Sequence, residues 1–451
     1  MSIIPQINQA MRTLLTTTTE TVAATLHYVK RADRATFTPS TLVQTLVYGW
    51  LAHPTATVEQ LAGHPLGDRL TVSAWRSRPK PLISASPPPP QPCSSPSWRP
   101  VTQRVPDHAI AADPVAIPIL QRFSSVRVYD STTSGLPDAL TTTWRGCGND
   151  TARGTAGLTC GVQIDLLTGA LCGLDVVHGR DSDYTLPVQH APMPVGSLRL
   201  ADLGFYSMDV LTAMGRAGIY WVSRLQSTSL LRVNGQAVRP LLAVVESLGS
   251  VDHWDGAVIV GTKGQLPARL LVRRVPKKIA KLRRQRVRTE AKGKCRPAAK
   301  AALALADWNI AITNVPPEML TRTEAMVLLR IRWQIELLFK LWKSHGRVDA
   351  WRTENPTRML CEIYAKVLGL VFQQWILVAS SWVNPERSLF KAAQIVAFFT
   401  AEFASAQQCA VQCEQVLSRI ARMIRRLART NKRQKTATTA QRLLALTAVT
   451  S

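Results

Sequence analysis

The order of apolar and polar residues predicts helices near the start of the chain and again over its last third. Thr38-Pro39-Ser40 is typical of a helix start, and Thr57 with Gln60 resembles a capping box, so residues 36–63 are expected to form short helices. After residue 316 the chain is expected to be helical almost to its end. Residues 324–345 lack Gly and Pro and repeat apolar positions every three or four residues, which predicts one long helix.

Between these regions the pattern predicts strands. Short β-rich runs lie at 126–130, 158–166, 171–177, 198–202, 218–225 and 308–315, with a helical repeat around residues 210–214. Asn234-Gly235 and Asp255-Gly256 are expected to form hairpin turns, because both dipeptides favour tight turns. Strands and helices mixed in this order predict an α/β layered fold.

Charge indicates the kind of partner. The 451 residues carry 55 Lys and Arg against 29 Asp and Glu, a formal net charge of +26, so a polyanion is the expected ligand. Residues 277–300 hold 11 basic residues and one acid. Phosphate contacts are expected from this run, with a solvated loop as the alternative. The residues chosen from it are Lys277, Lys278, Arg283 and Arg284.

Composition disfavours several other classes. With 46% apolar residues the chain can bury a substantial core, which argues against wholesale disorder. No stretch of about 18 residues is uninterruptedly apolar, and the first residues lack the pattern of a secretory signal, so a cytoplasmic, nucleoid-associated protein is expected. The eight cysteines are scattered without paired metal-ligand spacing, so a zinc site is not expected.

Residues 74–106 interrupt the pattern of regular structure. They contain 10 of the 28 prolines and no acidic residue, which is typical of an extended linker. Two origins stay open, a natural linker or an out-of-frame reading between two compensating indels that would impair this copy. In either case the N-terminal helices are expected to be flexibly tethered.

Three carboxylates are candidates for chemistry. Asp130 and Asp202 each follow an apolar strand, and Glu336 lies inside the predicted long helix, with Arg332 and Lys343 near the same face. Taken singly, each has an ordinary alternative, a strand-ending turn for the aspartates and a salt-bridged surface for the glutamate. Together they offer the hard oxygen ligands that two divalent metal ions need to promote a phosphodiester displacement.

These residues also carry a resemblance to a known family. Residues 129–132 with 135–137 resemble the first catalytic block of DDE-class insertion-sequence transposases of the IS-four family, and residues 201–206 resemble the second block. Arg332-x3-Glu336-x6-Lys343 matches most of that family's signature Tyr-x2-Arg-x3-Glu-x6-Lys. The tyrosine position holds Leu329 instead, so a phosphate contact or a packing role of that tyrosine is in question. The resemblance covers roughly residues 120–375.

The resemblance implies a fold and an activity. It implies a ribonuclease-H-like core with an inserted β-rich domain, flanked by helical N-terminal and C-terminal regions. Asp130, Asp202 and Glu336 would bind two Mg²⁺ (or Mn²⁺) ions, and the enzyme would cut double-stranded element ends and join them to target DNA, as a homodimer in the synaptic complex. Arg332 and Lys343 would contact phosphates. Trp308 resembles the position where related enzymes stack a tryptophan on a flipped base, with plain core packing as the equal alternative.

The expected organisation has six parts. They are a helical module expected to bind DNA ends (1–73), a Pro-rich linker (74–118), the first part of the core (119–226), the β-rich insertion with the basic run (227–315), the rest of the core (316–380) and a basic helical C-terminal region (381–451). Two other functions stay open: a catalytically impaired transposase that represses transposition by binding DNA, and an unrelated basic nucleic-acid-binding protein.

Overall fold

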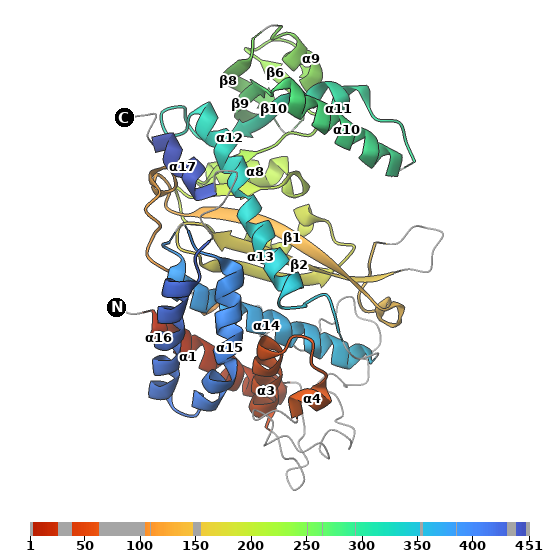
Figure 1. Ribbon diagram of the computed structural model, residues 1–451. Coiled ribbons are helices and arrows are strands. Elements are labelled where there is room, and N and C mark those ends of the chain that lie inside the picture. The colour runs from red at the N-terminus through yellow and green to blue at the C-terminus, as the bar shows by residue number, and fades with distance from the viewer. Residues whose placement is uncertain are drawn as a thin grey trace.

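The computed structural model describes residues 3–25, 38–62, 104–108, 110–147, 155–249, 251–263, 265–293, 295–351, 355–384, 386–430 and 439–447. Figure 1 shows three tiers: strands and helices of the predicted insertion at the top, the rest of the sheet in the middle, and most of the helices from the two ends of the chain below. Most of the predicted Pro-rich linker, residues 74–103, lies outside the described ranges.

The described strands form one ten-stranded sheet in the order β3-β2-β1-β4-β5-β10-β9-β8-β6-β7. Their bounds are β1 Val126–Leu136, β2 Ala156–Asp165, β3 Leu171–His178, β4 Leu198–Ala201, β5 Tyr220–Ser223, β6 Leu230–Val233, β7 Arg239–Pro240, β8 His253–Val260, β9 Leu266–Arg274 and β10 Trp308–Thr313. β1, β4 and β5 run parallel, whereas β2 is antiparallel to β1 and β10 is antiparallel to β5. Every residue of β2 is buried, which explains its nearly continuous apolar run.

The insertion extends this sheet and does not form a separate one. β10 pairs with β5 on one side and with β9 on the other, so the hydrogen-bonded ladder runs unbroken from the central strands into the insertion. The hairpin predicted at Asn234-Gly235 is confirmed, because β6 pairs with β7 around this turn and both residues have positive φ angles (48° and 73°). The turn predicted at Asp255-Gly256 is wrong: both residues lie inside β8 and pair with β9.

The helices account for most of the remaining described chain. The basic run begins with a helix, α10, where a loop was the alternative expectation. The helices are α1 Ile4–Thr13, α2 Thr19–Thr25, α3 Pro39–Ala52, α4 Val58–Ala62, α7 Pro118–Gln121, α8 Met208–Arg216, α9 Leu241–Glu246, α10 Lys277–Gly293, α11 Lys300–Leu305, α12 Arg322–Ile331, α13 Trp333–Ser344, α14 Pro356–Ser381, α15 Leu389–Ala406, α16 Ala410–Leu427 and α17 Thr439–Thr447; short 3₁₀ turns include Asp183–Thr185 and Leu203–Phe205.

The predicted long helix over 324–345 is two helices. α12 ends at Ile331 and α13 begins at Trp333, with Arg332 between them outside both. Periodicity could not reveal this break, because the apolar positions repeat across it without a Gly or Pro. The side chain at the break is held by contacts with residues distant in sequence, which are described below.

The N-terminal helices pack against the C-terminal ones. α3 contacts α14 and α15, and α1 contacts α16, so Trp50 near the end of α3 shares one hydrophobic core with Trp375 of α14. The predicted caps are confirmed, since Thr38 accepts a hydrogen bond from the Thr41 amide and Thr57 exchanges hydrogen bonds with Gln60. The expectation of flexibly tethered N-terminal helices is wrong, because burial of this shared apolar surface holds them in place.

Two described helices, residues 358–381 and 389–406, are long and apolar enough to cross a membrane by length and composition alone. In the first, 94% of the apolar window is buried inside the protein, as is typical of a core helix. Its Lys366 and Glu362 form a fully buried ion pair (2.7 Å) within the same helix. The apolar character of this helix is therefore accounted for by its place in the core.

Candidate active site

Two of the three predicted carboxylates are brought together by the register of the parallel strands. The last parallel pair between β1 and β4 is Tyr129 with Ala201, so Asp130 and Asp202 follow at the same level on neighbouring strands. β4 ends there, whereas β1 continues to Leu136 along β2 alone. Asp130 therefore lies within a strand and not at its end as predicted, and the end of β4 beside it leaves room for its side chain.

The third carboxylate comes from helix α13, which packs across β1 (Figure 1). Glu336 lies in the first turn of this helix, and Lys343 in its last turn donates a hydrogen bond to the main-chain oxygen of Thr133 in β1 (3.0 Å). This bond fastens the far end of α13 to the strand that carries Asp130. The structure therefore brings Asp130, Asp202, Arg332, Glu336 and Lys343 to one cavity, as their order in the sequence predicted.

Arg332 lies at the centre of the carboxylates. Its Nη1 is 3.0 Å from Asp130 Oδ2, and its Nη2 is 3.0 Å from Glu336 Oε1 and 3.7 Å from Asp202 Oδ1. The Arg332 side chain is 16% exposed, against 17% for Asp130, 44% for Asp202 and 36% for Glu336. One guanidinium thus links two strands and a helix.

The surroundings of Asp130 disfavour the charged form of its carboxyl. The pKa of its carboxyl is raised to about 6: burial has the largest effect and raises it, Arg332 and the Ser131 amide lower it, and the negative charges of Asp202 and Glu336 raise it. The three carboxylates form ion pairs with one arginine, Arg332, while Lys340 and Lys343 line the same cavity, so the charges of the lining side chains balance overall.

The cavity measures about 830 Å³ and is lined by residues from strands, turns and helices. Its walls comprise Asp130, Ser131, Thr132, Asp202, Arg332, Glu336, Phe339, Lys340, Lys343, Ser344 and Phe390. Lys340 was not predicted, although its position four residues after Glu336 places it near the same helix face. Phe390 comes from α15, far along the chain, and carried no sequence signal.

Asp183 was also missed. It lies in a 3₁₀ turn, and its Oδ1 accepts a hydrogen bond from Ser131 Oγ at 2.5 Å, next to Asp130. A Cβ added at Gly204 would lie only 2.5 Å from the other oxygen of Asp183, so a larger residue there would force the Asp183 side chain to move. Asp183 therefore contacts both the part of β1 next to Asp130 and the turn that follows Asp202.

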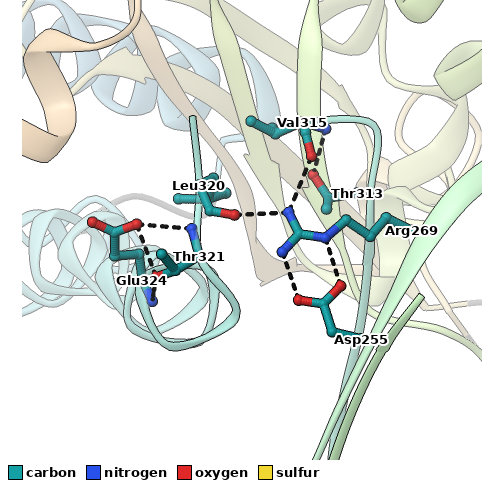
Figure 2. Close-up of polar contacts among 7 residues, drawn as sticks. All are labelled: Asp255, Arg269, Thr313, Val315, Leu320, Thr321 and Glu324. Atoms are coloured by element: carbon teal, nitrogen blue, oxygen red, sulfur yellow. Dashed lines mark hydrogen bonds and ion pairs between the residues drawn. The ribbon is translucent and has the colours of Figure 1, made fainter. Parts of the chain in front are cut away.

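The start of the helix pair is held by arginines from two directions. Arg269 of β9 forms a two-fold ion pair with Asp255 of β8 and donates to the main-chain oxygens of Leu320 (2.7 Å) and Val315 (3.3 Å), as Figure 2 shows. Those carbonyls belong to the segment that leads into α12. Thr321 and Glu324 then close a capping box at the helix start (Figure 2).

Arg122 supplies the second hold on α12. It pairs with Glu324 at 2.8 Å and donates to the Met319 main-chain oxygen at 2.9 Å. Burial alone would raise the pKa of the Glu324 carboxyl, but the hydrogen bonds from Arg122 and Thr321 together lower it. The insertion and the core thus both fix where α12 begins, and hence where Arg332 and Glu336 lie.

The remaining predicted DNA-binding residues lie in the insertion and do not line this cavity. Trp308 of β10 packs under the guanidinium of Arg274, 4.2 Å from its ring centre. Arg283 donates to the Trp308 main-chain oxygen (3.0 Å) and to Asn309 (2.6 Å), and Arg284 pairs with Asp307. These two arginines thus attach α10 to the start of β10.

Lys277 and Lys278, at the first turn of α10, are exposed. Leu329, at the position of the expected tyrosine, is 9% exposed and belongs to the hydrophobic core. Its side chain therefore packs and is not available to a phosphate.

Comparison with known protein families identifies this arrangement. The model of the family described as "Transposase DDE domain" matches residues 121–372, more than half of the chain. The chain belongs to the DDE-domain transposase family. The match spans all three carboxylates and the insertion between the second and the third, and it confirms the resemblance to DDE-class insertion-sequence transposases.

Individual transposases are similar over the same region. The chain is 27% identical over 270 residues to a transposase for insertion sequence element IS231F from Bacillus thuringiensis subsp. israelensis, covering 56% of each protein. It is 22% identical over 294 residues to that for IS1151 from Clostridium perfringens, covering 61% of this chain and 62% of that protein. The match to the putative transposase InsL for IS186A from Escherichia coli K12 is 25% over 180 residues, 38% and 49% of the two chains. The chain thus spans 56% of the length of the first of these relatives and 62% of the length of the second.

Divalent metal ions are implied by this family, and the donor set fits them. Carboxylate oxygens are the hard ligands that Mg²⁺ and Mn²⁺ prefer, and oxygens of Asp130, Asp202 and Glu336 all face the Arg332 guanidinium, which lies between them. Over the described ranges, no three His, Cys, Asp or Glu side chains stand close enough together to form a metal-binding group.

Proposed function

We propose that this chain is a DNA transposase that cuts the ends of an insertion sequence and joins them to target DNA by two-metal phosphodiester transesterification. The observation that carries the proposal is the convergence of Asp130, Asp202 and Glu336, from β1, from the end of β4 and from α13, at one cavity. The family membership of the chain supports the same chemistry.

The proposal assigns roles to the residues of the cavity. Asp130, Asp202 and Glu336 would hold two Mg²⁺ or Mn²⁺ ions, which when bound supply the activation of the attacking oxygen and the stabilisation of the leaving oxygen. Lys340 and Lys343 line the same cavity and would bind phosphate oxygens of the strand to be cut. Phe339 and Phe390 form an apolar part of the wall, against which a deoxyribose or base of the strand could pack.

We further propose that the central strands form a ribonuclease-H-like core. The order β3-β2-β1-β4-β5, with β1, β4 and β5 parallel and β2 antiparallel, supports this assignment. In such a sheet the carboxyl ends of parallel strands meet at one edge, where strand-end side chains can share a ligand. Asp202 follows the end of β4 at that edge, and Asp130 lies beside it within β1.

Double-stranded DNA is the proposed partner, at element ends and at the target, with a homodimer in the synaptic complex. The net charge of +26 supports a long-range attraction to DNA and a nucleoid-associated, cytoplasmic location. The six parts expected from the sequence remain a proposal for how these tasks are divided. A repressor that binds ends without cutting them is the second candidate, favoured only by the unusual sequence of residues 74–106.

Strand cleavage on the flanking genomic DNA separates these functions. The wild-type chain is expected to nick at the element ends in Mg²⁺, whereas Asp130→Asn, Asp202→Asn and Glu336→Gln should each abolish nicking and keep end binding within a few-fold. These amide replacements keep side-chain size and remove one charge. Arg273→Ala, an exposed change on β9 outside the cavity, is a matched control that should still cut. Nicking by Glu336→Gln at the wild-type rate would contradict the proposal; binding without any cleavage by the wild-type chain would favour the repressor.

A further inference from the structure

Arg332 forms ion pairs with carboxylates, which a role in binding DNA phosphates would not by itself require. Its two terminal nitrogens reach Asp130, Asp202 and Glu336, three carboxylates from three different elements. It is the residue at which α12 and α13 are interrupted. At 16% exposure the guanidinium is largely removed from water, so these contacts are stronger than those of an open surface pair.

A divalent cation needs the same oxygen atoms. Asp130 Oδ2, Asp202 Oδ1 and Glu336 Oε1 all point at the guanidinium, 3.0 to 3.7 Å from its nitrogens. Mg²⁺ binds carboxylate oxygens at about 2.0–2.1 Å, so the three carboxylates would have to leave the guanidinium and draw closer together before one ion could use them. The arginine and the ion therefore exclude one another at this point.

A phosphate is the alternative partner for the arginine. A guanidinium binds phosphate with two parallel hydrogen bonds, and a DNA strand in the cavity would bring such a group close to the carboxylates. Transfer of Arg332 from carboxylates to phosphate would leave the negative charges of the three carboxylates without the cation that contacts them directly. Those charges would attract divalent cations more strongly than the paired set does.

We propose that Arg332 is a positioning residue that holds the three carboxylates together in the DNA-free chain, competes there with divalent cations, and releases the carboxylates when a DNA phosphate takes its place. This inference rests on the proposed function for its metal and DNA ligands. By linkage, DNA and cations must then strengthen each other's binding by the same factor.

Lys343 provides a matched comparison within the same cavity. It also carries one positive charge, but its ammonium donates to the main-chain oxygen of Thr133 and, among the residues that the structure describes, forms no ion pair with a carboxylate. Removal of Lys343 changes the local charge by the same amount without vacating the carboxylate oxygens. A general charge effect and a direct competition can therefore be told apart.

The first test measures Mn²⁺ binding to the full-length, DNA-free chain by the loss of the free Mn²⁺ signal in electron paramagnetic resonance. Arg332→Ala is expected to bind Mn²⁺ about tenfold more tightly than wild type, which corresponds to roughly 1.4 kcal/mol. Lys343→Ala should change the affinity by less than about threefold. Arg332→Lys, which keeps the charge and is the safer variant for folding, should fall between wild type and Arg332→Ala. Affinity in Arg332→Ala equal to or weaker than that of wild type would overturn the proposal.

The second test adds linear duplex DNA to the same titration. Duplex DNA should tighten Mn²⁺ binding to wild type and to Lys343→Ala, but not to Arg332→Ala, in which the carboxylates are already free. An equal effect of DNA on all three proteins would show that Arg332 does not couple the two ligands. Neither titration measures cleavage, so the two proposals can fail separately. If the chain bound Mn²⁺ as expected but never cut DNA, the proposed function would be contradicted, whereas this role of Arg332 would stand.

Discussion

Arg269 of β9 joins the insertion to the helix pair that carries the active-site residues, and its replacement by alanine should loosen α12. The arginine is 12% exposed, pairs with Asp255 through two hydrogen bonds of 2.6 Å, and donates to the carbonyls of Val315 and Leu320 (Figure 2). Arg269→Ala removes all four hydrogen bonds at once. Asp255→Ala removes only two and leaves Arg269 on the carbonyls.

The contacts give an estimate of each cost. Hydrogen bonds that involve a charged group contribute about 1.5–3 kcal/mol when buried, and less when water reaches them. The side chain of Asp255 is 27% exposed, so its replacement should cost about 1–2 kcal/mol. Arg269→Ala should cost about 3–4 kcal/mol, because it also removes a charged donor from two carbonyls.

Denaturant unfolding of Arg269→Ala, Asp255→Ala and the double variant measures these differences. The coupling energy between the two residues should be about 1–2 kcal/mol. Hydrogen exchange should rise in residues 316–331 of Arg269→Ala and much less in Asp255→Ala. Arg273→Ala, on the same strand with an exposed side chain, is the control and should lie within about 0.5 kcal/mol of wild type.

Equal costs for Arg269→Ala and Asp255→Ala would refute this reasoning. Such a result would mean that the hydrogen bonds to Val315 and Leu320 do not stabilise the fold. Unchanged hydrogen exchange at the start of α12 in Arg269→Ala would have the same meaning. The position of Glu336 would then depend on the core side of α12 alone.

Three further predictions concern charge, pH and stacking. Lys277→Ala and Lys278→Ala should each lower the slope of log affinity for DNA against log salt by about 0.9, and an unchanged slope would exclude both from the phosphate contacts. Since the pKa of Glu324 is lowered from 4.5 in the folded chain, the stability it contributes is present above that value and is lost as pH falls through the lowered pKa. Arg122→Ala should therefore lose its disadvantage against wild type as pH falls through the lowered pKa, and a difference in unfolding free energy that stays constant with pH would contradict this. Trp308→Ala should slow a hairpin step but spare the first nick, whereas a uniform loss of all steps with reduced thermal stability would assign Trp308 to packing under Arg274.

Local sequence determined a large part of the secondary structure. Helix starts at Thr38 and Thr57 follow from side chains that satisfy free amides within three residues, and the Asn234-Gly235 turn follows from the ease with which both residues adopt positive φ. The strands of the core follow from β-branched and apolar runs. In each case the residues that decide the structure are neighbours in the chain, so the pattern suffices.

The sequence also determined which residues carry the chemistry, but not how they meet. The blocks around Asp130, Asp202 and Glu336 identify the family, and three carboxylates specify hard-cation chemistry. Their placement at one level depends on the parallel register of β1 and β4, and on α13 lying across β1. Those pairings join residues many positions apart, which no local pattern encodes.

Tertiary structure alone decided the features that depend on such distant contacts. The helix break at Arg332 lies where one guanidinium meets carboxylates from three elements, and the apolar repeat passes through it unchanged. Asp255-Gly256 has the composition of a turn, yet pairing with β9 and the Arg269 ion pair keep it in a strand. The N-terminal helices are fixed because their apolar faces are buried against α14 and α15, a partner that lies more than 300 residues away in the chain. Burial and charge pairing between distant segments outweigh local propensity at these positions. They also bring together the site residues, which the sequence identified but could not place in space.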